Sequence, residues 1–178
     1  ITDHFGYYFP GKDKGPRPYA GSLEGLRHFF GDVDAASARF PMLRVLKCPE
    51  LNAASLDHDI PDEAVQVSQF FLCEPPGVEQ DEIASNTDGR LAHVHKAAEL
   101  RKATSKPVVL VHPFRAAVNH RLVKAPMIER WVTGLDSTAE GSFSDEDLSA
   151  FFMFDLRGYA DACRQEGVPV EINGNTDS

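Results

Sequence analysis

Hydrophobic residues along the chain recur with two spacings, one typical of strands and the other of helices. Short runs of branched and aromatic residues predict strands at 42–48, 67–73, 108–111 and 168–174. Apolar residues three or four positions apart predict helices at 22–30, 88–104 and 144–166. A stretch rich in glycine and proline predicts a long loop at 6–21. Strands and helices therefore alternate over much of the chain.

Breaker and capping residues mark the ends of several of these elements. Pro49 cannot donate a backbone hydrogen bond, and we expect it to end the strand at 42–48. Ser144 opens a capping-box pattern, and Gly167 is the expected C-cap of the last helix. The continuous apolar run at 108–111 follows a helix and is typical of a strand buried on both faces. This order predicts the α/β class with parallel strands.

Composition narrows the class of protein. A chain of 178 residues with 42% hydrophobic and 25% charged residues is most simply one folded domain, over residues 1–178. Its apolar runs are far shorter than the ~20 residues of a membrane span, so we expect a soluble protein without a membrane partner. A net charge of −9 argues against nucleic-acid binding by bulk charge. Three cysteines without a CxxC pair fit a reducing compartment, and we expect the cytoplasm.

Polar residues with metal-binding side chains stand at or just after the end of each expected strand, including a strand that would end at residues 1–4. In chain order they are Asp3, His4, Glu50, Glu74 and His112, followed on later segments by Arg115, Glu171 and Asn173. The carboxyl ends of parallel strands meet at one edge of the sheet, so these side chains are expected to converge. Imidazole and carboxylate together suit Zn, Mn or Fe. Any one of these residues alone has an ordinary structural interpretation. Their recurrence at one edge favours a divalent-metal site.

The motif His93-x-His95 also suggests metal binding but is expected to be structural. Alternate residues share a face on a strand, whereas this pair lies in the helix predicted at 88–104. Residues two apart on a helix point to nearly opposite sides and cannot bind one ion together. His28 and His120 are interpreted as surface or helix-end residues, and no placement argument applies to His58.

Four stretches of the chain resemble the PHP family, the polymerase and histidinol phosphatase metallohydrolases. They occur in the order of that family's motifs: ITDH at 1–4, VLKCPELNA at 45–53, PVVLVHPFR at 107–115 and CRQEGVPVEINGNT at 163–176. The last stretch is the most diagnostic, because ITDH and the His-Pro pair are short. The resemblance implies a distorted β/α barrel, related to the TIM barrel, that carries two or three divalent metal ions.

The same resemblance assigns roles to individual residues. His4, Glu50 and His112 would be metal ligands, with Glu50 bridging two ions. Asp3 and Glu74 are further candidate ligands, Arg115 is a candidate phosphate contact, and Glu171 and Asn173 are candidate pocket or supporting residues. The implied reaction is hydrolysis of a small phosphorylated substrate by a metal-activated water. Tyr7, Tyr8, Lys12, Lys14 and Arg17 either cap the pocket or belong to a basic surface loop.

The chain also departs from the family pattern. The family's first motif, an H-x-H, would stand before Ile1, and its last motif, an Asp-x-His, would follow the EIN strand; neither is present. At one position where the family has a histidine, this chain has Cys73-Glu74. We expect either a fragment of a longer enzyme or an inactive relative. Two alternatives stay open: an amidohydrolase acting on C–N bonds, and a non-catalytic PHP-like module.

Overall fold

Four short parallel strands, with helices in the connections between them, form the described part of the fold. The computed structural model describes residues 2–4, 23–53, 56, 60–77, 82–113 and 145–171, and for residues 2–4 it describes the backbone alone. The elements in chain order are β1 (Thr2–His4), α1 (Leu23–Ala38), β2 (Cys48–Leu51), α2 (Asp62–Val67), β3 (Phe71–Cys73), α3 (Ile83–Thr104), β4 (Val108–Leu110), α6 (Asp145–Phe152) and α7 (Leu156–Glu166).

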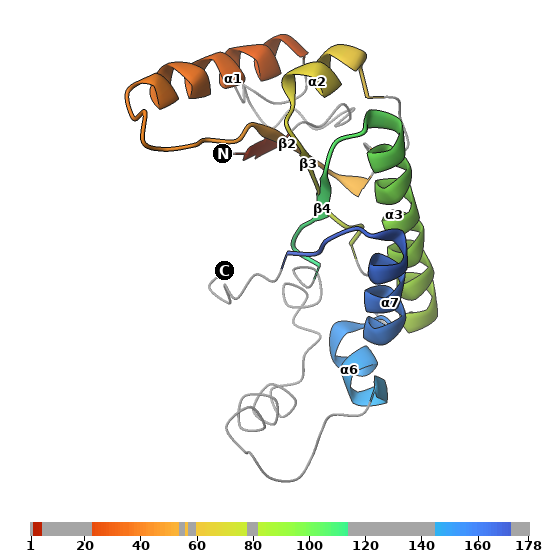
Figure 1. Cartoon of the computed structure of the whole chain (residues 1–178). Coiled ribbons are helices and arrows are strands. Elements are labelled where there is room, and N and C mark those ends of the chain that lie inside the picture. The colour runs from red at the N-terminus through yellow and green to blue at the C-terminus, as the bar shows by residue number, and fades with distance from the viewer. Residues whose placement is uncertain are drawn as a thin grey trace, which may run out of the picture.

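The sheet has the strand order β1-β2-β3-β4, and every neighbouring pair is parallel. Beyond β4, Val170 forms a single parallel bridge to Leu110. Strands that follow one another in the chain are thus neighbours in the sheet, with a helix in each of the connections β1–β2, β2–β3 and β3–β4 (Figure 1). The α/β class with parallel strands is confirmed. The sheet is open within the described residues, so a closed barrel is not seen there.

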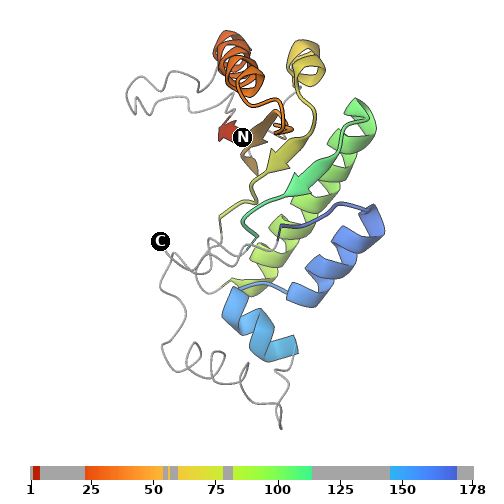
Figure 2. The same ribbon diagram turned by 60° about the vertical axis from the view of Figure 1, so that its left-hand side comes forward.

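One face of the sheet packs against the helices and forms the core. Leu51 of β2, Phe71 and Cys73 of β3, and Val108 and Leu110 of β4 are fully buried there. They belong to one hydrophobic cluster with apolar residues of α1, α3 and α7. Helices α3 and α7 lie side by side next to β4 (Figure 2). Because strand residues alternate between faces, Leu72 and Val109 point away from this core.

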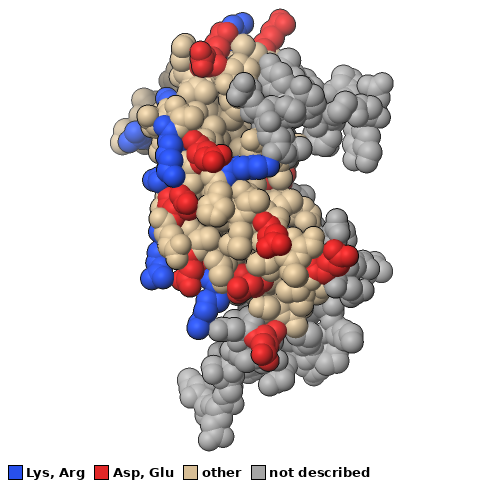
Figure 3. Space-filling model, turned by 90° about the vertical axis from the view of Figure 1, so that its right-hand side faces the viewer, with Lys and Arg blue, Asp and Glu red and all other residues tan. Residues whose placement is uncertain are grey.

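The outer face formed by α3 and α7 is an ordinary charged surface. Acidic and basic side chains are mixed on it, and the described part shows no continuous basic area (Figure 3). Two helical ion pairs on this side join Arg164 to Asp161 and Lys102 to Glu166. None of the described helices combines the length and the hydrophobicity that crossing a membrane requires.

The predicted boundaries hold best for α3 and β4. The helix predicted at 88–104 begins five residues earlier, at Ile83, and ends at Thr104 as predicted. The helix predicted at 22–30 begins at Leu23 and continues to Ala38. The strand predicted at 67–73 is restricted to Phe71–Cys73, because Val67 ends α2. Strand 108–111 is seen as Val108–Leu110.

The predicted boundaries of β2 and of the last helix were wrong. The strand predicted at 42–48 lies at Cys48–Leu51, with Pro49 inside it, while Met42 and Leu43 are exposed. The helix predicted at 144–166 is interrupted after Phe152, and α7 starts anew with Asp155 as its N-cap. The strand predicted at 168–174 shows only the bridge at Val170, since 172–174 lie outside the described residues.

Candidate metal centre

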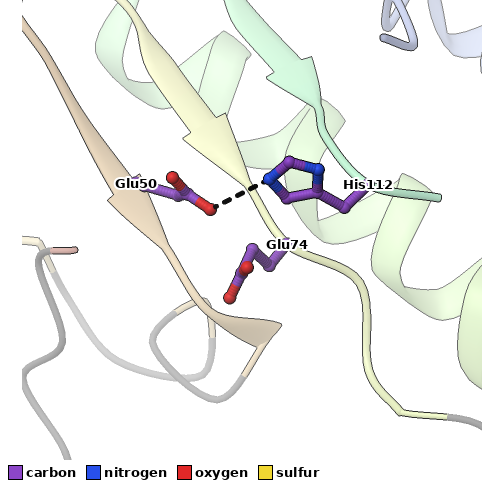
Figure 4. A group of neighbouring side chains, drawn as sticks. All are labelled: Glu50, Glu74 and His112. Carbon is purple, nitrogen blue, oxygen red and sulfur yellow. Dashed lines mark ion pairs between the residues drawn. The ribbon is translucent and has the colours of Figure 1, made fainter. Parts of the chain in front are cut away.

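Glu50, Glu74 and His112 meet at the carboxyl edge of the sheet. One ligand atom from each lies within 4.8 Å of the others. Nε2 of His112 is 3.7 Å from Oε1 of Glu50, whose side chain points toward the ring, and the Glu74 side chain lies beside both (Figure 4). These side chains come from the ends of three adjacent strands. The convergence expected from the sequence is therefore seen for these three residues.

The alternation of strand residues explains why the two glutamates share a face. Glu50 pairs in register with Leu72, and paired residues on adjacent strands point to the same side of the sheet. Glu74 lies two residues after Leu72, and its backbone N–H donates to the carbonyl of Leu51, which continues the ladder. Both carboxylates therefore project from the face opposite the helices. Cys73 lies between Leu72 and Glu74 in the chain, so its side chain points to the opposite face, into the core.

His112 joins this cluster because its backbone leaves the regular strand conformation. A straight extension of β4 would place residue 112 on the same face as Leu110, which packs against the helices. His112 instead has a φ of 52°, in the left-handed region. A non-glycine residue there costs about 1–3 kcal/mol. The following residue is Pro113, and residues before proline usually have φ near −120°. The fold therefore accepts backbone strain at the residue that carries the imidazole.

Glu171 lies on the other side of the His112 ring. Its Oε2 is 3.5 Å from Nδ1 of His112 and accepts a hydrogen bond of 3.3 Å from the His112 backbone N–H. Glu171 is placed there by the bridge beside it, because its own N–H donates to the carbonyl of Leu110. The ring thus has one nitrogen toward Glu50 and the other toward Glu171. Metal-bound histidines in proteins commonly have such a carboxylate behind them, which fixes the ring and its tautomer.

The donor set fits a divalent cation. Two carboxylates close together in a partly buried place repel each other, and a cation between them removes that repulsion. Imidazole nitrogen and carboxylate oxygen are the ligands that Zn, Mn and Fe accept together. Ligand atoms around a tetrahedral zinc are about 3.4 Å apart, given bond lengths near 2.1 Å. The 4.8 Å limit within which the three donors lie is somewhat wider, a difference that side-chain rotation can close.

Cys73 does not compete with Glu74 as a ligand. Its side chain is fully buried in the core, and this burial raises the pKa of the thiol to about 12. The thiol is therefore neutral at ordinary pH, whereas metal binding requires the thiolate. Of the pair Cys73-Glu74, the residue that reaches the cluster is Glu74.

His93 and His95 have separate environments, as their position on a helix implies. His93 is buried and hydrogen-bonds to the backbone of Cys73, while His95 is exposed and lies 3.2 Å from the carboxylate of Glu166. Burial lowers the pKa of His93 to about 4, so its ring is neutral near pH 7. The two rings do not form a shared metal site. His28 is also exposed and lies beside Asp32.

Arg90 is a residue near the site that the sequence interpretation did not single out. Its guanidinium is fully buried, and Nη1 donates a 2.7 Å hydrogen bond to the carbonyl of Pro113. Burial lowers the pKa of Arg90 to about 10, which still leaves the group charged at neutral pH. The available signal was its position: Asn86, Arg90 and His93 are four and three residues apart, so they share one face of α3.

The remaining predicted site residues are only partly placed. Asp3 and His4 belong to β1, and the backbone of His4 pairs in register with that of Glu50. Their side chains lie outside the described part, as do Arg115, Asn173 and the loop residues Tyr7, Tyr8, Lys12, Lys14 and Arg17. His58 and His120 also lie outside it.

Comparison of the chain with protein-family models, with curated proteins and with solved structures found no significant match in any of the three. The candidate site therefore has to be judged on its own geometry.

Proposed function

We propose that this protein is a metal-dependent phosphoesterase, as the resemblance to the PHP family implies, with its metal centre at Glu50, Glu74 and His112. The observation that carries the proposal is the convergence of these three side chains at the carboxyl edge, with Glu171 behind the imidazole. This edge is where parallel α/β folds place their active sites. Mn, Zn or Fe is the expected cofactor, because the donors are nitrogen and oxygen.

Each residue has a distinct part in this proposal. Glu50 and Glu74 supply negative charge that holds a cation, and Glu50 is the more buried of the two. His112 supplies a neutral nitrogen donor, and Glu171 keeps its ring oriented. A divalent ion held there would act as a Lewis acid toward the phosphoryl group and would lower the pKa of a water molecule. Arg115 is proposed to contact the phosphate of a small substrate.

The described cluster accounts for one ion. The second or third ion that the resemblance implies would need further ligands, for which His4 and Asp3 are the candidates. His4 pairs with Glu50 in the β1–β2 register, which brings its backbone to the same edge. Glu50 is accordingly the residue proposed to bridge two ions.

A non-catalytic metal-binding module is the second candidate. The observation that favours it is Glu74, which stands in the cluster where the family has a histidine. An amidohydrolase gains no such support, because its distinguishing feature was a shared face for His93 and His95. These two lie apart on α3.

The test combines metal binding with hydrolysis in the full chain. Chelator-treated protein is titrated with Mn²⁺ and with Zn²⁺ by calorimetry, and p-nitrophenyl phosphate hydrolysis is then measured with the loaded protein. We expect at least one equivalent of tightly bound metal and hydrolysis that depends on it. Both should be lost in His112→Ala and kept in His95→Ala, the matched exposed histidine. Binding without hydrolysis supports the module, and absence of binding in the unmodified protein rejects the metal centre.

A further inference from the structure

The buried guanidinium of Arg90 has an unusual set of contacts. Besides the hydrogen bond to the Pro113 carbonyl, its Cζ lies 4.8 Å from the centre of the Phe154 ring. Within the described part of the chain, Nε and Nη2 have no hydrogen-bond partner. Arginine is rarely buried to this degree unless it is paired, because removing its charge from water is unfavourable. A buried arginine with these contacts is therefore expected to have a specific role.

The carbonyl that Arg90 binds is well placed to control His112. Pro113 has no N–H, so its carbonyl is the only hydrogen-bonding group on its own backbone. His112, directly before it, has the left-handed φ of 52° that brings the ring toward Glu50. A hydrogen bond to the Pro113 carbonyl anchors the residue directly after His112, and so limits how far the backbone at residue 112 can rotate. Arg90 thus reaches the candidate ligand through one residue of backbone.

The neighbours of Arg90 on α3 make contacts of the same kind. Asn86 donates to the carbonyl of Met153, another of the non-glycine residues with a positive φ, here 58°. His93 hydrogen-bonds to the backbone of Cys73, directly before Glu74. The three buried polar residues of α3 therefore hold irregular or strand-end backbone on three separate segments. Two of those segments carry candidate ligands.

We propose that Arg90 is a positioning residue of the metal centre, holding the Pro113 carbonyl so that His112 keeps the conformation that directs its imidazole toward Glu50 and Glu74. The inference rests on the proposed metal centre and adds a residue that would not itself touch the ion. Without this hydrogen bond, the backbone at residue 112 can relax toward the extended conformation, which turns the ring away from the two carboxylates.

The first arm of the test measures metal affinity in the full chain. Arg90→Met removes the donor and keeps an unbranched apolar side chain. Val94→Ala, on the same buried face of α3, is the control because it weakens core packing without removing the hydrogen bond to the Pro113 carbonyl. By calorimetry with Mn²⁺ or Zn²⁺, we expect a 10- to 100-fold loss of affinity in Arg90→Met. The metal affinity of Val94→Ala should stay within about twofold of that of the unmodified protein, even if its melting temperature falls as much as that of Arg90→Met.

A milder variant keeps the test decisive if Arg90→Met does not fold. Arg90→Lys retains the charge but has a shorter reach and a single donor group, and we expect it to lose roughly tenfold in affinity. Affinity within twofold of the unmodified protein in the folded Arg90 variants would overturn the inference. An equal loss in Val94→Ala would also overturn it, because general destabilisation would then explain the effect.

The second arm reads the position of His112 without metal. The ring and amide signals of His112 are compared by NMR in the metal-free unmodified protein, Arg90→Lys and Val94→Ala. We expect displaced His112 signals in Arg90→Lys alone, and unchanged signals there would contradict the positioning role. If the unmodified protein binds no metal, the proposed function fails, while this arm still decides whether Arg90 positions His112.

Discussion

Gly167 at the end of α7 and His112 after β4 both have a left-handed backbone, and they differ in how unfavourable that conformation is. Gly167 ends α7 with a φ of 63° and its N–H bonds back to the helix carbonyls of Arg164 and Cys163. His112 follows β4 with a φ of 52° and precedes a proline. Glycine adopts this conformation without a steric penalty, whereas histidine does not. The end of α7 therefore has a glycine, for which the left-handed conformation is not strained. The end of β4 has a strained histidine, whose side chain is a candidate metal ligand.

The polar groups around these two residues differ in the same way. Near Gly167, basic side chains contact Glu166: Lys102 and His95 lie beside its carboxylate, and Arg101 donates to its backbone carbonyl. Near His112, the carboxylates of Glu50, Glu74 and Glu171 surround a single imidazole. The first arrangement stabilises the α3–α7 contact by itself. Within the described residues, the second brings three carboxylates around one imidazole, an arrangement that suits a bound cation.

The largest expected effect separates the carboxylates of these two regions. Glu50→Gln keeps the shape of the side chain and removes its charge. Metal affinity should then fall at least about a hundredfold, because loss of a residue that only supports a ligand already lowers affinity by about 10- to 100-fold. Glu166→Gln should leave metal affinity unchanged and slightly lower the melting temperature, because the group that Lys102 and His95 contact loses its negative charge. Calorimetry and thermal unfolding measure the two effects. Equal affinity in both variants would contradict the assignment of Glu50.

Acid should weaken the fold through His93, on the face of α3 beneath the site. Burial lowers the pKa of this ring to about 4, against an ordinary value of 6.5, with Arg90 and Lys96 contributing in the same direction and the Cys73 hydrogen bond opposing it. The unfolded chain therefore binds the proton more readily between these two pH values, and stability falls as pH decreases from 6.5 to 4. The expected loss is about 3 kcal/mol.

Urea unfolding at several pH values measures this loss. His93→Gln should flatten the stability profile between pH 6.5 and 4, while His95→Gln, with an exposed ring, should leave the His93 component of the slope in place. A slope that survives in His93→Gln would show that other groups cause the acid sensitivity. The metal-free protein is the appropriate sample, since metal binding adds a pH dependence of its own.

The smallest expected effect tests the left-handed conformation itself. Asparagine tolerates this conformation better than alanine, so His112→Asn should be more stable than His112→Ala by about 0.5–1 kcal/mol in the metal-free protein. Neither replacement is charged, which separates backbone strain from electrostatics. At the other position, Gly167→Ala should cost about 1 kcal/mol. Denaturant unfolding gives both differences, and an alanine at 112 as stable as asparagine would mean that residue 112 is not strained.

The same contrast shows which features could be predicted from sequence. Local patterns sufficed for α3, β4 and the cap at Gly167, because helix formers, a buried apolar run and a C-cap glycine act over a few residues. The gathering of Glu50, Glu74 and His112 at one edge followed from a general property of parallel sheets, whereas the face on which His112 lies depends on its unusual φ. The position of β2 could not be predicted in this way, because the short strand accommodates Pro49 near its start, where proline was expected to end a strand.

The supporting contacts were beyond sequence reasoning for a physical reason. The role of Arg90 depends on a hydrogen bond to Pro113, 23 residues away in the chain. A buried arginine on a helix also has the same local signature as one that extends its charge into solvent. The unusual φ of His112 is equally a result of tertiary contacts, because its local sequence favours an extended conformation.

The most direct test of the metal centre is anomalous diffraction from crystals of the full chain grown with Mn²⁺ or Zn²⁺, recorded on both sides of the metal absorption edge. The account predicts an anomalous peak at the carboxyl edge of the sheet, within bonding distance of Glu50, Glu74 and the imidazole of His112. A peak bound elsewhere, or none at this edge while the metal is present at saturating concentration, would contradict it.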